Sequence, residues 1–391
     1  MKTHVALPVS QRLSQARRRS LVLALAGGAA LVGLSARAQP APGKGDILIG
    51  RSTALSGGMA PFLAPIHEGQ DAAVEDANAK GGIGGRKIRL VTLDDGFDPR
   101  RTLENARQLS EKEGVLALLG VSGTSQVMAL LPYLVQAKLP LISVYTGSPA
   151  IRAQQHPYLF TTRASYADEL VKIVRNLVAV QTSRIAVAYE NNDFGKLLLP
   201  LVEKTIAAEG ATLAGSHAIA PTGADANDAA KALAAQKPQA VLLVAAGPPV
   251  VAYVRANRAH LGVPVYTLSL GAGSAVLKAL GDDARGLAVA RTGPSPTKPT
   301  IALTRDFQAS MKRHDKPVDY DRYTGYMDAR VLIEGLRAAG PGVTRASLVQ
   351  AMEGLGNLDL GGYSYQFSPQ NHHGSNYVDI AVVGSGGVYR Q

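Results

Sequence analysis

The stretch AVEDANAKGGIGGRKIRLVTLDDGFDP, residues 73–99, joins a helical pattern to an apolar strand through a cluster of glycines. A loop that cradles a dinucleotide phosphate follows a strand and opens a helix, whereas these glycines follow a helix and lead into a strand. We therefore expect a helix C-cap and turn at residues 81–85, followed by a strand over residues 87–93. Asp98 and Pro99 then have the residue types of an N-cap and of the first helical position.

Short apolar runs and amphipathic helical patterns alternate in the same way down to about residue 290, which predicts an α/β fold with parallel sheets. The predicted strands are rich in Val, Ile and Leu, as is typical of strands covered by helices on both faces. They lie at residues 47–50, 87–93, 115–119, 141–144, 184–189, 240–244 and 265–268. The remaining predictions are helices over 300–313, 320–339 and 345–352 and strands over 377–383 and 388–389.

The first 38 residues have the organisation of a secretory signal peptide. Arginines at 17–19 precede an apolar run at 21–34, and a small-x-small site at 36–38 predicts cleavage before Gln39. The apolar run is too short for a retained membrane span. The arginine pair also permits twin-arginine export, and the general secretory route stays equally open. Cleavage leaves 353 residues, which at about 150 residues per domain predicts two domains.

Charge and composition exclude several classes of function. Removing the six basic residues of the signal peptide lowers the formal charge from +11 to +5, and no Lys/Arg run marks a nucleic-acid face. The chain has no cysteine, which excludes disulfides and thiol catalysis, and its eight histidines lack metal-ligand spacing. Asp94 and Asp95 have no general acid or nucleophile nearby and are expected to cap a turn. We expect no metal, no cofactor, and a monomer without a membrane span after cleavage.

Two polar turns follow neighbouring predicted strands. Residues 120–125 lead into a helix, where free N–H groups and the helix dipole suit a ligand carboxylate. On the residues alone, the interpretation that Ser122, Thr124 and Ser125 only cap that helix is favoured over ligand binding. A second polar turn, residues 145–149, follows the next strand. Because the carboxyl ends of parallel strands meet at one edge of a sheet, both turns are expected to face one ligand crevice.

A third turn, residues 191–195, stands in the same relation to the strand at 184–189. Its Phe194 either is buried or stacks on a ligand, and the residues alone leave both open. Residues 120–123 resemble a hydrolase nucleophile elbow only faintly, since the last glycine comes one residue too early for G-x-S-x-G. No nucleophile and base are paired in the sequence, so we expect a binding protein and not an enzyme.

The stretch at residues 73–88 strongly resembles the leucine/isoleucine/valine-binding proteins, the type 1 periplasmic binding proteins of ABC importers. The likeness covers the mature chain and continues through residues 93–99, 160–163, 184–187, 193–195 and 280–287. This resemblance implies two Rossmann-like α/β lobes with parallel-sheet cores, joined by three crossovers. It implies a lobe 1 of residues 45–163 and 291–367, and a lobe 2 of residues 164–290 and 368–391.

The resemblance also implies a ligand site in the cleft between the lobes. The serine that binds the ligand carboxylate in the family falls on Ser122, and aromatic positions of the family fall on Phe62 and Phe194. Tyr320 or Tyr323 are further cleft candidates. The ligand-binding residues implied in this way are Phe62, Ser122, Gly123, Thr124, Tyr145, Thr146, Gly147, Tyr166, Phe194 and Ser269.

The chain departs from the amino-acid binders of this family in two places. Ser269 stands where they place a glutamate for the ligand ammonium, and residues 245–249 lack their tyrosine. Losing the buried partner of an ammonium costs about 3–5 kcal/mol. The ligand is therefore expected either to lack an ammonium or to find its acid at Glu190 or Asp193. Branched-chain amino acids, amides, and aromatic or aliphatic acids stay open as ligands.

The function implied by the resemblance is capture of a small carboxylate-bearing ligand in the periplasm by domain closure. The loaded protein would then dock on ABC permease subunits at the inner membrane. A periplasmic sensor subunit of a signalling receptor is the alternative, which neighbouring genes would distinguish. A hydrolase is the third and least supported possibility.

Overall fold

The computed structural model describes residues 45–153, 155–385 and 389–390. The expected signal peptide lies outside these residues.

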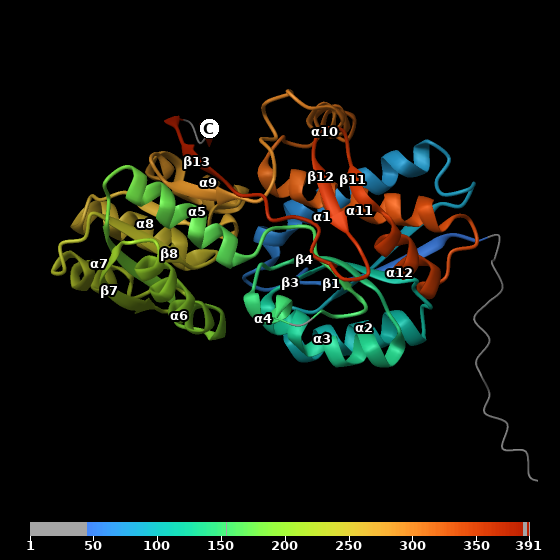
Figure 1. Cartoon of the computed structure of the whole chain (residues 1–391), viewed down its shortest axis with the longest axis horizontal. Helices are drawn as coiled ribbons and strands as arrows, with labels where there is room; N and C mark the ends of the chain where they lie inside the picture. The colour runs from blue at the N-terminus through green and yellow to red at the C-terminus, as the bar shows by residue number, and fades with distance from the viewer. Residues whose placement is uncertain (1–44, 154, 386–388, 391) are drawn as a thin grey trace, which may run out of the picture. The chain divides into compact units, whose positions relative to one another are not determined.

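Lobe 1 is built on a sheet of five parallel strands (Figure 1). Their order is β2 (Ile88–Asp94), β1 (Ile47–Thr53), β3 (Ala117–Ser122), β4 (Leu141–Tyr145) and β5 (Leu159–Phe160). Alternate residues of these strands face opposite layers of helices, so each strand is apolar on both sides. One layer comprises α1 (Ala60–Ala79), α10 (Ala302–Arg313), α11 (Tyr320–Ala339) and α12 (Arg345–Gly354). The other comprises α2 (Pro99–Glu111) and α3 (Thr124–Ala137), with the short α4 (Pro149–Arg152) beyond them.

Helices α1 and α11 cross with their backbones in close approach. A Cβ atom on Gly69 would lie 1.9 Å from the carbonyl oxygen of Arg322, and one on Gly325 would lie 1.9 Å from that of Ile66. No side chain fits at either position, so the two glycines permit this packing. The crossing completes the helical layer that covers one face of the lobe 1 sheet.

Lobe 2 is built on a seven-stranded sheet. Its order is β14 (Tyr389–Arg390), β13 (Asp379–Val383), β10 (Ala288–Arg291), β9 (Val265–Thr267), β8 (Ala240–Val244), β6 (Arg184–Glu190) and β7 (Thr212–Ile219). Strands β6 to β10 are parallel, while β13 and β14 pair antiparallel. One face packs on α5 (Tyr166–Ala179) and α6 (Asp193–Ala208). The other packs on α7 (Ala226–Ala234), α8 (Pro248–His260), α9 (Ser274–Leu280) and the 3₁₀ segment η2 (Gly281–Ala284).

The predicted fold class is confirmed: two α/β lobes each have a parallel-sheet core. The chain passes between the two sheets three times, after β5, after β10 and after the hairpin of β11 (Gly356–Asp359) and β12 (Ser364–Phe367). The lobe boundaries proposed near these passages stay predictions. Every predicted strand overlaps a strand of one of the two sheets within the described residues, whereas β5, β7, β10 and the hairpin are not predicted from the sequence patterns.

Two helix N-caps that the sequence predicts are also present. The Asp98 side chain accepts hydrogen bonds from the N–H groups of Arg100 and Arg101 at the start of α2. Ser165 and Asp168 make a reciprocal capping box before α5. These caps fix where each helix begins.

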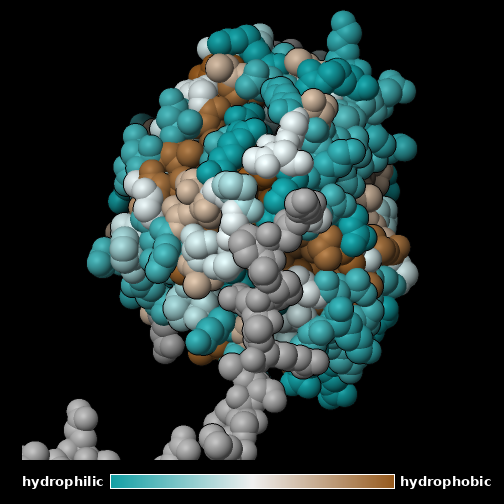
Figure 2. Space-filling view, turned by 90° about the vertical axis from the view of Figure 1, so that its right-hand side faces the viewer, coloured by the Kyte–Doolittle hydropathy of each residue, from teal (hydrophilic) through white to brown (hydrophobic). Residues whose placement is uncertain are grey.

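No helix within the described residues is long and apolar enough to cross a membrane. Figure 2 shows the side of the molecule at the right of Figure 1, where hydrophilic residues predominate and hydrophobic ones show in areas between them. An exposed surface of this mixed kind is usual for a folded domain in water.

Candidate functional site

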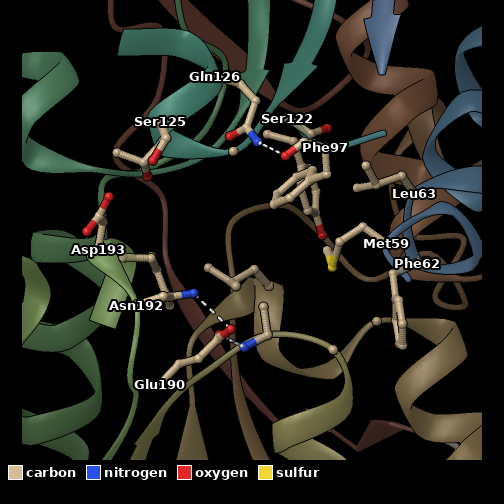
Figure 3. A pocket seen from close by; sticks show the side chains of 18 of the residues that line it. Met59, Phe62, Leu63, Phe97, Ser122, Ser125, Gln126, Glu190, Asn192 and Asp193 are labelled. Carbon is tan, nitrogen blue, oxygen red and sulfur yellow. Dashed lines mark hydrogen bonds between the residues drawn. The ribbon is translucent and has the colours of Figure 1, made fainter. Parts of the chain in front are cut away.

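A cavity of about 300 Å³ lies where loops at the carboxyl ends of the strands of both lobes meet (Figure 3). Such edges are where open α/β sheets bind ligands. Most of its wall is apolar. The apolar side chains are those of Met59, Phe62, Leu63, Phe97, Pro99, Phe194, Leu270, Ala275 and Val276. The side chains with polar groups are Ser122, Thr124, Ser125, Gln126, Tyr145, Tyr166, Glu190, Asn192, Asp193 and Asp321.

The turn between β3 and α3 presents Ser122 to this cavity. Gly123, with φ of 95°, is the N-cap of α3, and no side chain caps the helix. The Ser122 side chain is 4% exposed, and its Oγ has no hydrogen-bond partner within the described structure. Burying a hydroxyl without a partner is unfavourable. Ser122 therefore does not serve as the helix cap, and its hydroxyl is available to a ligand.

The turn after β4 contributes Tyr145 to the cavity and uses its other residues as supports. Thr146 shares a 2.9 Å hydrogen bond with Thr124, and the carbonyl oxygen of Gly147 accepts one of 2.7 Å from the N–H of Tyr166. Neither Thr146 nor Gly147 lines the cavity. They join the two turns and the start of α5.

Besides Tyr145, three predicted aromatic residues line the cavity. Phe62 comes from α1, while Tyr166 and Phe194 pack edge to face with ring centroids 5.6 Å apart. Phe194 is half-buried, so it both supports Tyr166 and faces the cavity. Tyr320 and Tyr323 do not line it, because both point elsewhere from α11. Their neighbour Asp321 faces the cavity instead. Asp321 is not among the residues predicted from the sequence.

Ser269 does not line the cavity either. Its N–H and Oγ donate hydrogen bonds of 2.6 and 2.9 Å to the carboxylate of Glu169, which is fully buried. Arg163 donates from Nη2 to Ser269 and to Thr292 at 3.2 Å, and its guanidinium lies 4.3 Å from the centre of the Tyr145 ring. Ser269 thus belongs to a buried polar network behind the cavity wall.

Glu190 is a buried carboxylate in the lobe 2 wall of the cavity. It ends β6, where Oε1 accepts 2.8 Å from Asn192 Nδ2 and Oε2 accepts 3.2 Å from the N–H of Ala246. Burial raises the pKa of Glu190 from 4.5 to about 7, against the opposing effect of the Ala246 hydrogen bond. Asp193 lies nearby in the first turn of α6 and is exposed.

Asp321 is the third carboxylate of the cavity. It lies in the first turn of α11 and accepts hydrogen bonds of 2.6 and 3.0 Å from the N–H and Oγ of Ser274, at the start of α9. Among the lining residues that the structure describes there is no Lys, Arg or His. The cavity therefore combines an apolar wall with three acids and no fixed cation.

The described part of the chain has no cluster of side chains that could hold a metal ion, since no group of three or more metal-ligating side chains is present there. Asp94 instead accepts hydrogen bonds from the N–H groups of Leu55, Ser56 and Gly96 and from the Ser56 hydroxyl, and these bonds hold the pKa of its carboxyl well below its usual range. It caps turns, as the sequence predicts.

Comparisons with known proteins agree with this architecture. A family model described as periplasmic binding protein matches residues 46–387. The Leu/Ile/Val-binding protein of Escherichia coli K12 is 24% identical over 40% of this chain and 43% of its own length. A substrate-binding periplasmic protein of Ralstonia solanacearum is 30% identical, with a TM-score of 0.81 over 88% of this chain and 99% of that one. An extracellular ligand-binding receptor of Verminephrobacter eiseniae is 26% identical, with a TM-score of 0.82 over 88% and 100%.

The same fold occurs in proteins that bind chemically different ligands. A fatty acid ABC transporter substrate-binding protein of Thermomonospora curvata is 23% identical, with a TM-score of 0.78 over 88% of this chain and 91% of that one. A solute-binding protein of R. palustris in complex with benzoate is 20% identical, with a TM-score of 0.77 over 88% and 95%. At these identities only the fold is shared. The ligand must be argued from the cavity itself.

Proposed function

Because the chain belongs to the periplasmic binding protein family, we propose that it is the substrate-binding component of an ABC importer. It captures a small ligand between its lobes in the periplasm and delivers it to permease subunits at the inner membrane. The family consists of binding proteins that act outside the cytoplasm, not of enzymes.

The unpartnered hydroxyl of Ser122 carries this proposal. It is buried in a cavity wall at the start of α3, beside the free N–H groups of the first helical turn. A ligand oxygen placed there accepts from the hydroxyl and from these N–H groups, and the helix dipole favours negative charge at that end. Binding therefore supplies the partner that Ser122 lacks in the free protein.

The remainder of the wall favours a ligand with an apolar body. Phe62, Phe97 and Phe194 face the same space as the aliphatic side chains, and about 300 Å³ suits a molecule of amino-acid or aromatic-acid size. A wholly polar ligand would leave its groups without partners against these walls.

Binding and closure are coupled in this proposal because both lobes supply contacts. Ser122 and Tyr145 come from lobe 1, while Glu190 and Phe194 come from lobe 2. A ligand that touches both sides stabilises the form in which the lobes meet, and the three connecting segments serve as the hinge.

A thermal-shift screen of residues 39–391 tests the proposal. Amino acids, amides, and aromatic and aliphatic carboxylates are compared; a ligand at a hundred times its Kd stabilises the protein by about 2.7 kcal/mol. Ser122→Ala should weaken the binding that is found. Ser143→Ala, which removes a buried hydroxyl of β4 outside the cavity, is the matched control and should leave affinity unchanged. Failure of every compound to bind would contradict the proposal.

A further inference from the structure

We propose that Glu190 binds a positively charged group of the ligand, so that the cavity takes a small organic ammonium compound with an apolar body. This inference rests on the proposed function, because it assigns the class of ligand that the same cavity holds. It places the recognition of charge in lobe 2, at the end of β6.

Glu190 differs from the other acids of the cavity in having no positive group to balance it. Asp193 and Asp321 lie in the first turns of α6 and α11, where the helix dipole favours a carboxylate. Glu190 instead ends a strand and takes part in no ion pair with any described residue. A ligand cation would provide the missing counter-charge.

The carboxylate is also held in a fixed position. The Asn192 side chain binds Oε1, and its own Oδ1 accepts from the N–H of Gly195 as the cap of α6. The N–H of Ala246 fixes Oε2 from the loop after β8. Each oxygen thus has one donor and keeps capacity for a second hydrogen bond, which an ammonium can donate.

A second feature of the cavity indicates which molecule fits. Figure 3 shows Ser122 and Glu190 on opposite walls, with apolar side chains between them. The buried Ser122 hydroxyl lacks a partner within the described structure, so this wall binds an oxygen of the ligand. A molecule that spans the cavity therefore has a cationic end, an apolar body and an oxygen-bearing end.

The carboxylates that line the cavity repel a ligand whose only charged group is negative. Glu190, Asp193 and Asp321 line the cavity together with Tyr145 and Tyr166, and no basic side chain lies among the described lining residues. A carboxylate without an ammonium would bring a fourth negative charge into this space. An ammonium lowers that repulsion and also favours ionisation of Glu190, whose pKa burial raises.

Two matched sets of probes test the inference by calorimetry. They are 5-aminopentanoate, pentylamine and pentanoate, and 4-(aminomethyl)benzoate, benzylamine and 4-methylbenzoate, in which the first member of each set carries its ammonium and its carboxylate at opposite ends of an apolar body. We expect the best binder of at least one set to carry an ammonium. We expect Glu190→Gln to weaken it at least tenfold, whereas Asp228→Asn, which removes an exposed acid of α7 in lobe 2 outside the cavity, should leave it unchanged.

The pH dependence of affinity in the wild-type protein distinguishes recognition of charge by Glu190 from a purely structural role of this residue. Affinity of the wild-type protein for the ammonium probe should fall about tenfold from pH 8 to pH 6, as Glu190 takes up its proton. The profile of Glu190→Gln should be flat. Tighter binding by the des-amino acids, lost in Ser122→Ala, would overturn this inference and leave the proposed function standing. Absence of binding by all six probes would overturn the assignment of this ligand class, and the wider screen then decides the proposed function.

Discussion

Replacing Glu190 by glutamine should stabilise the ligand-free protein at alkaline pH. Burial raises the pKa of this carboxyl from 4.5 to about 7. A group with a raised pKa holds its proton more tightly in the folded state, so its stabilising contribution is complete below pH 4.5 and is lost as the pH rises through 7. At pH 8 the ionised carboxylate then costs the folded protein roughly 3 kcal/mol relative to its protonated form.

Glutamine has the shape of the protonated carboxyl and no charge, so it removes this cost, while its amide nitrogen cannot accept one of the two hydrogen bonds that the carboxyl oxygens accept. The lost hydrogen bond affects the variant equally at every pH, whereas the cost of ionisation is present only in the wild-type protein at high pH. Thermal unfolding of both proteins is measured between pH 5 and pH 9, and the difference in Tm, variant minus wild type, should rise by several degrees between pH 5 and pH 8. A difference that does not change with pH, or a variant that is less stable at pH 8, would refute the assignment of a neutral pKa to Glu190.

Three further substitutions give simple outcomes. Ser122→Ala should weaken ligand binding by about 1–2 kcal/mol with an unchanged Tm of the free protein, as calorimetry and thermal unfolding can determine; equal affinity would remove Ser122 from the site. Gly325→Ala should destabilise lobe 1 by at least about 2 kcal/mol in denaturant unfolding because its Cβ has no space, whereas Gly354→Ala, with nothing within 4 Å, should not. Ser269→Glu places a second buried acid against Glu169 and should lower the Tm sharply without strengthening the binding of any amino acid; a wild-type Tm would contradict the buried network around Glu169.

The strands could be predicted where burial on both faces leaves a continuous apolar run. Residues 240–244, all fully buried in β8, are such a run. Strand β7 lies at the edge of its sheet, and its segment from Thr212 to Ile219 is mostly half-exposed and includes Gly215 and His217. An edge strand with one solvated face has no such run, so the pattern of buried strands cannot find it.

The lobe 1 side of the site could be predicted because its turns directly follow buried strands. Ser122 and Tyr145 illustrate this, and both line the cavity. Asp321 could not be predicted, since it lies in the first turn of α11, and the sequence of this helix does not tell which residue faces the other lobe. The position of Ser269 depends on the 3₁₀ segment η1 (Ser269–Ala272), which turns its hydroxyl toward Glu169 instead of the cavity.

The close crossing of α1 and α11 has a consequence for the order of folding. Gly69 and Gly325 lie far apart in the sequence, so the helix that covers α1 emerges from the ribosome long after it, at about 5–20 residues per second. The strands of lobe 2 from β6 to β10 follow one another along the chain and need only nearby partners. We therefore expect this part of lobe 2 to fold while lobe 1 still exposes one apolar face of its sheet. During that interval a chaperone has a binding surface on lobe 1, which disappears once α11 packs against α1.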